Sequence, residues 1–346
     1  MRLALFTFMI STAMSQADQA LDTALESSNP DLQKWASICL VTGNAEKPIF
    51  QWHDYQDTGA RTDFWPASTI KLYAAIAALE LLHEQGQDLH SKVVFEHQDK
   101  AGIWQLDCTR TLPDMLSEVF RRSSNEDYTL LLRLVGIDRI NTQLLIPQRG
   151  YPHSALMRGY ANDRPWAYNR EEAQRIYFSS KNNSQATILQ NRWSGRHYAE
   201  ERGCSVIDVK TGNVTSAHEL TDTLRRLLFH EHLSKNERFK LTEQHIDFLL
   251  HGGENFVGLE TRNPDSGPSS WSPKMQSHFP NARFYHKCGV ISDHAMDLAC
   301  LDDRANGGPC CLWLLAVKAG HASKPTDGET IVGQMADAIA DWLRKK

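Results

Sequence analysis

The feature that most constrains the fold is an apolar segment with helical character, Thr69–Leu82 (TIKLYAAIAALELL). Alanine and leucine dominate the segment, and it contains no glycine or proline that would interrupt a helix. Because apolar side chains occur nearly all round this helix, none of its faces is suited to water. We therefore expect a helix buried at the centre of a domain and covered by other elements on every side.

Strand-like segments occur towards both ends of the chain. Apolar runs bounded by turn-forming residues mark two strands before the central helix and three after the helical middle of the chain. The expected strands span residues 31–43, 47–55, 282–290, 295–302 and 310–320. This order, with a last helix after the strands, predicts an α+β fold. An antiparallel five-stranded sheet from both chain ends would carry packed helices, and the middle would form an all-helical lobe.

The expected organisation is one domain preceded by a leader. Residues 1–17 have one positive charge at Arg2, an apolar run and small residues near the end, which is typical of a secretory signal peptide. A buried N-terminal helix is the alternative. Residues 18–346 would form the domain, with the α/β part at about 18–70 and 255–346. The helical lobe would span about 71–254, with a polar, irregular surface insertion at 170–212.

Composition excludes several classes of protein. Apolar residues make up 41% and charged residues 23% of the 346 positions, as in folded globular proteins. The net charge is −5 and no long basic run occurs, which argues against nucleic-acid binding. After the leader, no stretch approaches the about 20 apolar residues of a membrane span. We expect an exported monomer, periplasmic or secreted, that needs no metal or organic cofactor.

Seven cysteines fit export only loosely. Cys300 and either Cys310 or Cys311 flank a turn between two expected strands, so a cross-strand disulfide is one possibility. Buried free thiols are the other, because pairing cannot be read from sequence. The spacing of Cys and His matches no zinc-ligand pattern.

The buried helix begins with a pair of residues suited to nucleophilic catalysis. Ser68 and Lys71 are three positions apart, which places both side chains on one face of a helix, one turn apart. A serine hydroxyl needs a base to take its proton, and a lysine can serve when burial lowers its pKa towards neutrality. Ser-x-x-Lys is common by chance, so this pair alone is a weak signal.

A second element strengthens this interpretation. Ser123-Ser124-Asn125 interrupts two helical patterns between 111 and 136. Ser123 could pass a proton to the leaving group, and Asn125 could hold a substrate amide. By itself, such a sequence is most often a helix N-cap.

Two Lys-x-Gly triplets are candidates for the third motif of the site. Lys210-Thr211-Gly212 leads into an expected helix, whereas Lys287-Cys288-Gly289 lies within strand-like sequence. The chemistry requires an edge strand whose backbone N–H can complete an oxyanion hole beside the nucleophile. We therefore assign Lys287–Gly289 to the site and regard Lys210–Gly212 as a chance match.

Ser-x-x-Lys, Ser-x-Asn and a late Lys-x-Gly together resemble the penicillin-recognising serine hydrolases, and most closely the class A β-lactamases. The resemblance extends over nearly all of the chain after the leader. It implies the β-lactamase/transpeptidase-like fold and acylation of Ser68 by a β-lactam or related amide. Lys71 and Ser123 would handle protons, and Lys287 would attract a substrate carboxylate. The N–H groups of Ser68 and Val290 would form the oxyanion hole.

Two further positions follow from the same resemblance. Trp104 lies where the family often has an aromatic wall beside the cleft, although it could equally be a core residue. The loop that carries the family's deacylating glutamate is best matched by NDRPWAYNRE, residues 162–171. The corresponding residues are Asp163, Arg164 and Asn169, of which Asn169 is a candidate substrate-binding residue.

The chain departs from the family pattern at two places. Cys288 replaces a Ser or Thr whose hydroxyl would bond the substrate carboxylate, and a thiol donates weakly, so about 1 kcal/mol of binding or more should be lost. The glutamate position falls on Pro165 or Trp166. Glu171 and Glu172 follow, but a surface location suits them better, so we expect slow hydrolysis of the acyl-enzyme.

Three functions remain open at this stage. The first is β-lactam hydrolysis by an exported Ser-Lys enzyme. The second is an amidase, peptidase or esterase acting on a cell-wall peptide or another acyl compound, which both departures favour. The third is a catalytically retired binding protein. Against the third stands the joint presence of the residues Ser68, Lys71, Ser123, Asn125 and Lys287.

Overall fold

The structure is a computed structural model, and it describes ten stretches of the chain. They are residues 19–27, 30–56, 65–161, 174–179, 188–189, 193–203, 212–261, 273–291, 293–319 and 325–346. The expected leader, residues 1–17, lies outside the described residues, so its interpretation stays a prediction. The described part begins with a helix over residues 19–27 that the sequence analysis did not anticipate.

The main sheet is antiparallel and draws its strands from both ends of the chain, as expected. Its strand order is β2-β1-β10-β9-β8-β7. The strands are β1 Gln33–Gly43, β2 Pro48–Tyr55, β7 Glu260–Thr261, β8 Arg283–Ile291, β9 His294–Asp302 and β10 Cys310–Lys318. The five expected strands are confirmed, and the short β7 adds a sixth at the edge beside β8.

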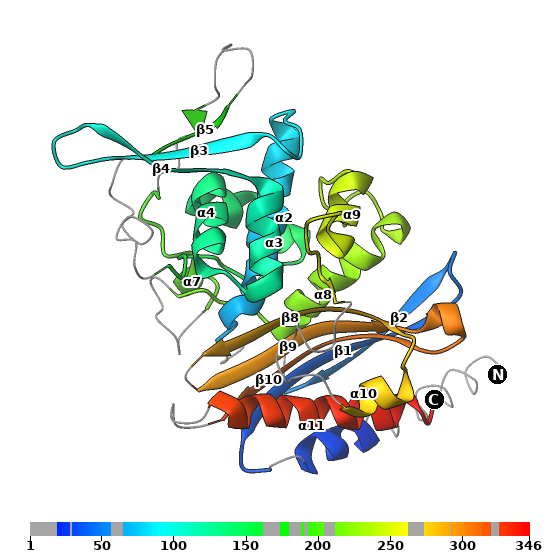
Figure 1. The fold of residues 1–346 in the computed structure, drawn as a ribbon. Helices are drawn as coiled ribbons and strands as arrows, with labels where there is room; N and C mark the ends of the chain where they lie inside the picture. Colours follow the sequence, from blue (N-terminus) through cyan, green and yellow to red (C-terminus); the bar gives the residue numbers. More distant parts are fainter. Residues whose placement is uncertain are drawn as a thin grey trace.

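Helices cover both faces of this sheet (Figure 1). The helices are α2 Lys71–Glu84, α3 Leu112–Arg122, α4 Asn125–Val135, α5 Ile137–Arg139, α7 Tyr198–Glu201, α8 Ala217–Leu228, α9 Glu243–His251, α10 Pro273–His278 and α11 Pro325–Leu343. α10, α11 and the 19–27 helix pack on one face, where Leu21, Met275 and Met335 belong to one hydrophobic cluster. α8 and the start of α2 lie over the other face, within a second, larger cluster.

The central helix behaves as its sequence predicts. Twelve of the 14 residues of α2 are buried, because α3, α4 and η2 (Ile140–Leu144) pack against it. Short turns of other helical types complete the described chain. They are η1 Ala67–Ile70, η2 Ile140–Leu144, η3 Pro147–Arg149, η4 His230–His232 and η6 Arg304–Asn306.

Local features explain where several helices begin and end, and the first of these, the break at Ser123–Asn125, was predicted. The break at Ser123–Asn125 separates α3 from α4. Ser216 caps α8 by accepting a hydrogen bond from Glu219 N at 3.0 Å. Gly252 ends α9 with a φ of 74°, and a side chain there would collide with the backbone of Phe256.

The middle lobe is not all-helical, which corrects the expectation. It carries a second antiparallel sheet of order β4-β3-β5-β6, with β3 Lys92–Gln98, β4 Trp104–Thr111, β5 Gln174–Ser179 and β6 Ile188–Leu189. β5 falls in the segment 170–212 that was expected to be an irregular surface insertion. Ile176 and Phe178 alternate on β5 and are buried, because this strand pairs with β3.

The six described cysteines are free thiols, Cys39, Cys108, Cys288, Cys300, Cys310 and Cys311. The possible disulfide between Cys300 and Cys310 or Cys311 is not formed. The strand register explains this, because Leu312 lies opposite Cys300, whereas Cys310 lies opposite Asp302. Of the two alternatives left open, the structure has the buried free thiols.

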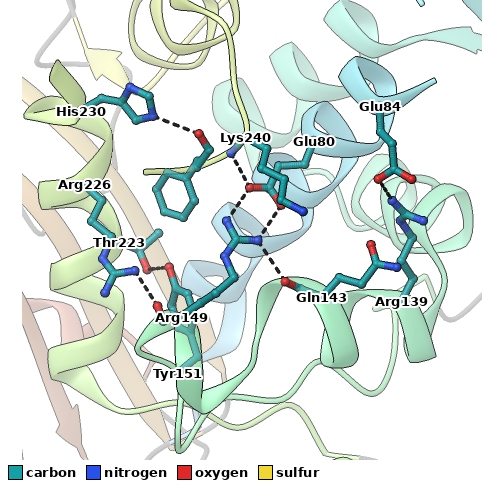
Figure 2. Close-up of polar contacts among 11 residues, drawn as sticks. Glu80, Glu84, Arg139, Gln143, Arg149, Tyr151, Thr223, Arg226, His230 and Lys240 are labelled. Carbon is teal, nitrogen blue, oxygen red and sulfur yellow. Dashed lines mark hydrogen bonds and ion pairs between the residues drawn. The ribbon is translucent and has the colours of Figure 1, made fainter. Parts of the chain in front are cut away.

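An ion pair holds the C-terminal half of α2 (Figure 2). The Arg149 guanidinium donates to both carboxylate oxygens of Glu80, at 2.9 and 2.6 Å. The Lys240 backbone N–H also donates to Glu80, at 2.8 Å, and Arg226 donates to the Arg149 carbonyl, at 2.6 Å. Three distant segments are therefore joined to the central helix.

Within the described stretches, no helix has both the length and the apolar character needed to cross a bilayer.

Candidate active site

Ser68 lies on a short turn, η1, that leads directly into α2. The preceding residue, Ala67, has a φ of +41°, in a region that residues with a Cβ seldom occupy. β8 passes close by: a Cβ added to Gly289 would lie 2.9 Å from the Ser68 backbone nitrogen. Glycine is therefore required here for the strand to approach the backbone of Ser68.

Lys71 is the first residue of α2 and has no exposed surface. Its Nζ lies 2.7 Å from Asn125 Oδ1, 2.5 Å from the Ser123 carbonyl oxygen and 3.2 Å from Ser123 Oγ. All three acceptors come from the junction between α3 and α4. The helix break predicted from the sequence therefore faces the start of the central helix.

Ser123 joins two amines. Lys287 Nζ donates to Ser123 Oγ at 2.9 Å, and the same hydroxyl lies 3.2 Å from Lys71 Nζ. Lys287 Nζ also donates to the carbonyl of Cys288 at 2.8 Å. Ser123 itself has a φ of +55°, so its backbone is held in a strained conformation that places the carbonyl and the hydroxyl on the same amine.

The surroundings of Lys71 favour its neutral form. Burial away from water, together with the nearby Lys287 charge, lowers the pKa of Lys71 from 10.5 to about 6, although Cys288 and Asp127 act in the opposite direction. Burial also lowers the pKa of Lys287. At neutral pH, Lys71 is therefore an amine with a free electron pair, which is the state that a general base requires.

Two tyrosines that the sequence analysis missed surround Lys71. The rings of Tyr128 and Tyr160 lie 5.7 and 5.9 Å from Lys71 Nζ, and 5.0 Å from each other. The Tyr160 hydroxyl donates to the Ala67 carbonyl at 3.2 Å. No motif marks either residue, because both act through contacts across the fold.

Cys288 and Val290 lie on β8 beside this cluster. Side chains alternate along a strand, so the Cys288 thiol lies on the face opposite Lys287, the face that α11 covers. Its cross-strand neighbour is Asp297, which is 1% exposed. Val290 has an exposed side chain at the end of the strand near Ser68.

Trp104 lies elsewhere, which corrects the expectation of an aromatic wall beside the cleft. It begins β4 and pairs with Gln98 at the far end of the β3–β4 hairpin. The Arg175 guanidinium stacks over its ring at 4.7 Å. Figure 1 shows this hairpin on the side of the helical lobe away from the main sheet. Trp104 was suggested as the aromatic wall only by its position in the sequence. It is the first residue of β4, and the length of this strand places it away from Ser123.

Three further expectations fall on residues that the structure does not describe. Asn169, with the rest of the loop matched to NDRPWAYNRE, lies outside the described residues, as do Glu171 and Glu172. Lys210 and Thr211 of the competing triplet lie outside them as well. The structure thus brings Ser68, Lys71, Ser123, Asn125, Lys287 and Gly289 together without testing these other positions.

The sequence and the fold were compared with those of known proteins. Residues 53–343 match the family described as the beta-lactamase enzyme family. The match covers well over half of the chain, which therefore belongs to this family. No curated protein matches the sequence.

The fold agrees with that of solved β-lactamases. A class A β-lactamase from Bacteroides cellulosilyticus is similar with a TM-score of 0.57 and 13% identity, covering 95% of this chain and 99% of its own. A β-lactamase from Streptosporangium roseum has a TM-score of 0.54 and 17% identity, with 96% and 100% covered. PBP-A, solved also as an acyl-enzyme with penicillin G, has a TM-score of 0.55 and 16% identity, with 96% and 97% covered.

Proposed function

We propose that this protein, a hydrolase of β-lactamase or penicillin-binding type by family and fold, is a serine hydrolase that forms an acyl-enzyme on Ser68. One observation carries the proposal. The Lys71 amine is fully buried, its pKa is lowered to about 6, and it lies one helical turn from Ser68 and within hydrogen-bond distance of Ser123. A buried lysine without a carboxylate bonded to it is costly to fold and is typical of catalytic sites.

In the proposed reaction, the neutral Lys71 amine takes the proton of Ser68 as Ser68 Oγ bonds to the acyl carbon. The carbonyl oxygen becomes an oxyanion, which the N–H groups of Ser68 and Val290 would stabilise. The bond from the acyl carbon to the leaving nitrogen or oxygen then breaks. Ser123 gives that atom its proton and recovers one from Lys71, and water later releases the acyl group from Ser68.

Lys287 supports this transfer in two ways. Its Nζ donates to Ser123 Oγ at 2.9 Å and so orients that hydroxyl for the relay. Its charge keeps a second ammonium ion at Lys71 unfavourable and attracts an anionic group of the substrate. Asn125, on the other side of Lys71, would hold the amide of the acyl group.

A second candidate is an amidase, peptidase or esterase in which β-lactams acylate the enzyme but leave slowly. The position of Cys288 favours it: the thiol lies on the face of β8 opposite Lys287 and across from the carboxylate of Asp297. A thiol beside a carboxylate is a poor site for a substrate carboxylate. We further propose that the protein is exported, because residues 1–17 have the pattern of a secretory signal peptide. We also propose that it acts as a monomer.

The test is to incubate the protein with a fluorescent penicillin, a chromogenic cephalosporin and a simple aryl ester, and to repeat each assay with Ser68→Ala. Turnover of the cephalosporin supports a β-lactamase, and stable labelling that needs Ser68 supports slow deacylation. Cleavage of the ester alone supports the second candidate. If none of the three reagents reacts at Ser68, the acyl-enzyme proposal is wrong. Loss of about 10⁴-fold or more is expected for Ser68→Ala in any active assay.

A further inference from the structure

The peptide bond between Ala67 and Ser68 has an unusual setting. Ala67 has a φ of +41°, which costs about 1–3 kcal/mol for a residue with a Cβ, so its surroundings must hold it there. Because a peptide unit is planar and trans, the Ala67 carbonyl and the Ser68 N–H point in opposite directions. Whatever fixes the carbonyl therefore also fixes the N–H of the nucleophile.

The Tyr160 hydroxyl is the group that fixes this carbonyl, by donating a hydrogen bond to it at 3.2 Å. On the other side of the peptide, the Ser68 nitrogen lies against β8, where a Cβ on Gly289 would approach it to 2.9 Å. Among the described residues, no acceptor takes the hydrogen bond of Ser68 N–H. This donor is thus available at the edge of β8, next to Val290.

Tyr160 is itself held firmly. Its backbone N–H donates to Thr129 Oγ1 at 3.0 Å, and Thr129 Oγ1 donates to the Asn125 carbonyl at 2.8 Å. Gly159 has no room for a side chain, because a Cβ there would lie 2.4 Å from Thr129 Oγ1. The segment before Tyr160 is therefore pressed onto α4, the same helix that begins with Asn125.

We propose that Tyr160 is a positioning residue for Ser68: by holding the Ala67 carbonyl, it turns the Ser68 N–H towards the oxygen that becomes negatively charged during acylation. Tyr160 takes no part in bond making or proton transfer in this proposal and acts through the Ala67 carbonyl. The inference rests on the proposed acyl-enzyme chemistry for its effect on rate, but the orientation of the peptide can be measured without any substrate.

The decisive variant is Tyr160→Phe, which keeps the ring beside Lys71 and removes only the hydroxyl. Its control is Tyr151→Phe, which removes another buried tyrosine hydroxyl, one that bonds to Thr223 at 3.0 Å instead of to the Ala67–Ser68 peptide. Thermal unfolding of both variants shows how much of any effect is loss of stability. Both are expected to fold, because each retains its apolar ring.

Two measurements test the inference. In Tyr160→Phe, the amide ¹H–¹⁵N resonance of Ser68 should move and a crystal structure should show a turned Ala67–Ser68 peptide, whereas Tyr151→Phe should match the wild type. The acylation rate constant should fall about 10- to 100-fold with little change in substrate Kd, since complete loss of one oxyanion donor costs about 10²–10³-fold.

Either of two results overturns the inference. One is an unchanged peptide orientation in Tyr160→Phe; the other is an acylation rate equal to that of Tyr151→Phe. If the wild-type protein acylates with none of the reagents, the proposed function fails, but the amide resonance and the peptide orientation still decide the role of Tyr160.

Discussion

The ionisable residues at the two ends of α2 have opposite surroundings. At its start, Lys71 is completely buried and bonds to a hydroxyl, an amide and a carbonyl, with no carboxylate among its hydrogen-bond partners in the described chain. Nine residues later, Glu80 is 9% exposed and bonds to both arms of the Arg149 guanidinium (Figure 2). The same helix therefore carries a buried amine to which no described carboxylate is bonded, and a buried carboxylate that is paired with a guanidinium.

The difference distinguishes a residue placed for chemistry, Lys71, from a residue placed for stability, Glu80. Burial lowers the pKa of Lys71 because no bonded counter-ion offsets it. At the other end, burial alone would lower the pKa of Arg149, but its hydrogen bonds to Glu80 raise it, so the guanidinium stays charged. We expect changes at Lys71 to affect chemistry and changes at Glu80 to affect stability.

The largest effect is expected for Lys71→Met. Removing the base should lower the acylation rate constant by about 10²–10⁴-fold, while the apolar side chain fits the buried position. In the wild type, the rate should rise about tenfold per pH unit below 6 and level off above it, since Lys71 must lose a proton to act. Stopped-flow acylation with a chromogenic substrate measures both. The exposed Lys92→Met is the matched control, and an equal loss in the two variants would contradict the assignment.

The second effect concerns Glu80→Gln. Breaking a buried, bidentate pair while leaving its partner charged should lower the free energy of unfolding by about 3–5 kcal/mol. The control is Glu84→Gln, one turn further along α2, whose exposed pair with Arg139 should contribute at most about 1 kcal/mol. Chemical denaturation gives both values. Similar losses of unfolding free energy in the two variants would contradict the difference between Glu80 and Glu84. A slower acylation step in folded Glu80→Gln would contradict the assignment of Glu80 to stability alone.

The third effect is a pH dependence of stability. Between pH 6 and 10.5 the unfolded chain holds a proton on Lys71 that the folded chain has lost, so wild-type stability rises with pH, by at most about 1.4 kcal/mol per unit from this group. Lys71→Met should therefore be more stable than the wild type at pH 7, by a margin that narrows towards pH 10. Guanidinium unfolding at several pH values checks the sign. A margin that stays constant between pH 7 and 10 would mean that Lys71 keeps its proton in the folded protein.

The smallest effect is expected for Cys288→Thr. Position 288 lies on the face of β8 opposite Lys287 and across from Asp297, so the new hydroxyl should leave the binding of carboxylate-bearing β-lactams almost unchanged. Stability should change little because the side chain is only half-buried. Competition binding with a penicillin and with its methyl ester measures the effect. A gain for the acid that the ester does not share would show that position 288 does meet the carboxylate.

The sequence predicted those parts of the fold that rest on strong local patterns. The apolar Thr69–Leu82 segment predicted the central helix, and choosing the strand over the loop selected Lys287–Gly289, which β8 brings beside Ser68. The second sheet was missed because β4 lacks a clear alternation: Asp107 interrupts its pairing with β3 as a bulge. β5 was missed because polar neighbours hide the alternation of Ile176 and Phe178.

The supporting contacts of the candidate site could not be read from the sequence. Tyr160 is 93 residues from the Ala67 carbonyl that it bonds, and Arg149 is 69 residues from Glu80. No local periodicity encodes such pairs; only the folded chain brings them together. Trp104 is the opposite case. Its position in the sequence suggested a place at the cleft, but it lies at the far end of the β3–β4 hairpin.

The pairing of β1 with β10 has a consequence for how this protein is made. Residues near position 35 find their strand neighbours only near position 316, so the contacts that support η1 and α2 have a very high contact order. A growing chain contains η1 and α2 long before it contains β8, β9 and β10. The candidate site is therefore completed only after these strands have formed, and any chain truncated before β10 should remain an open, aggregation-prone intermediate.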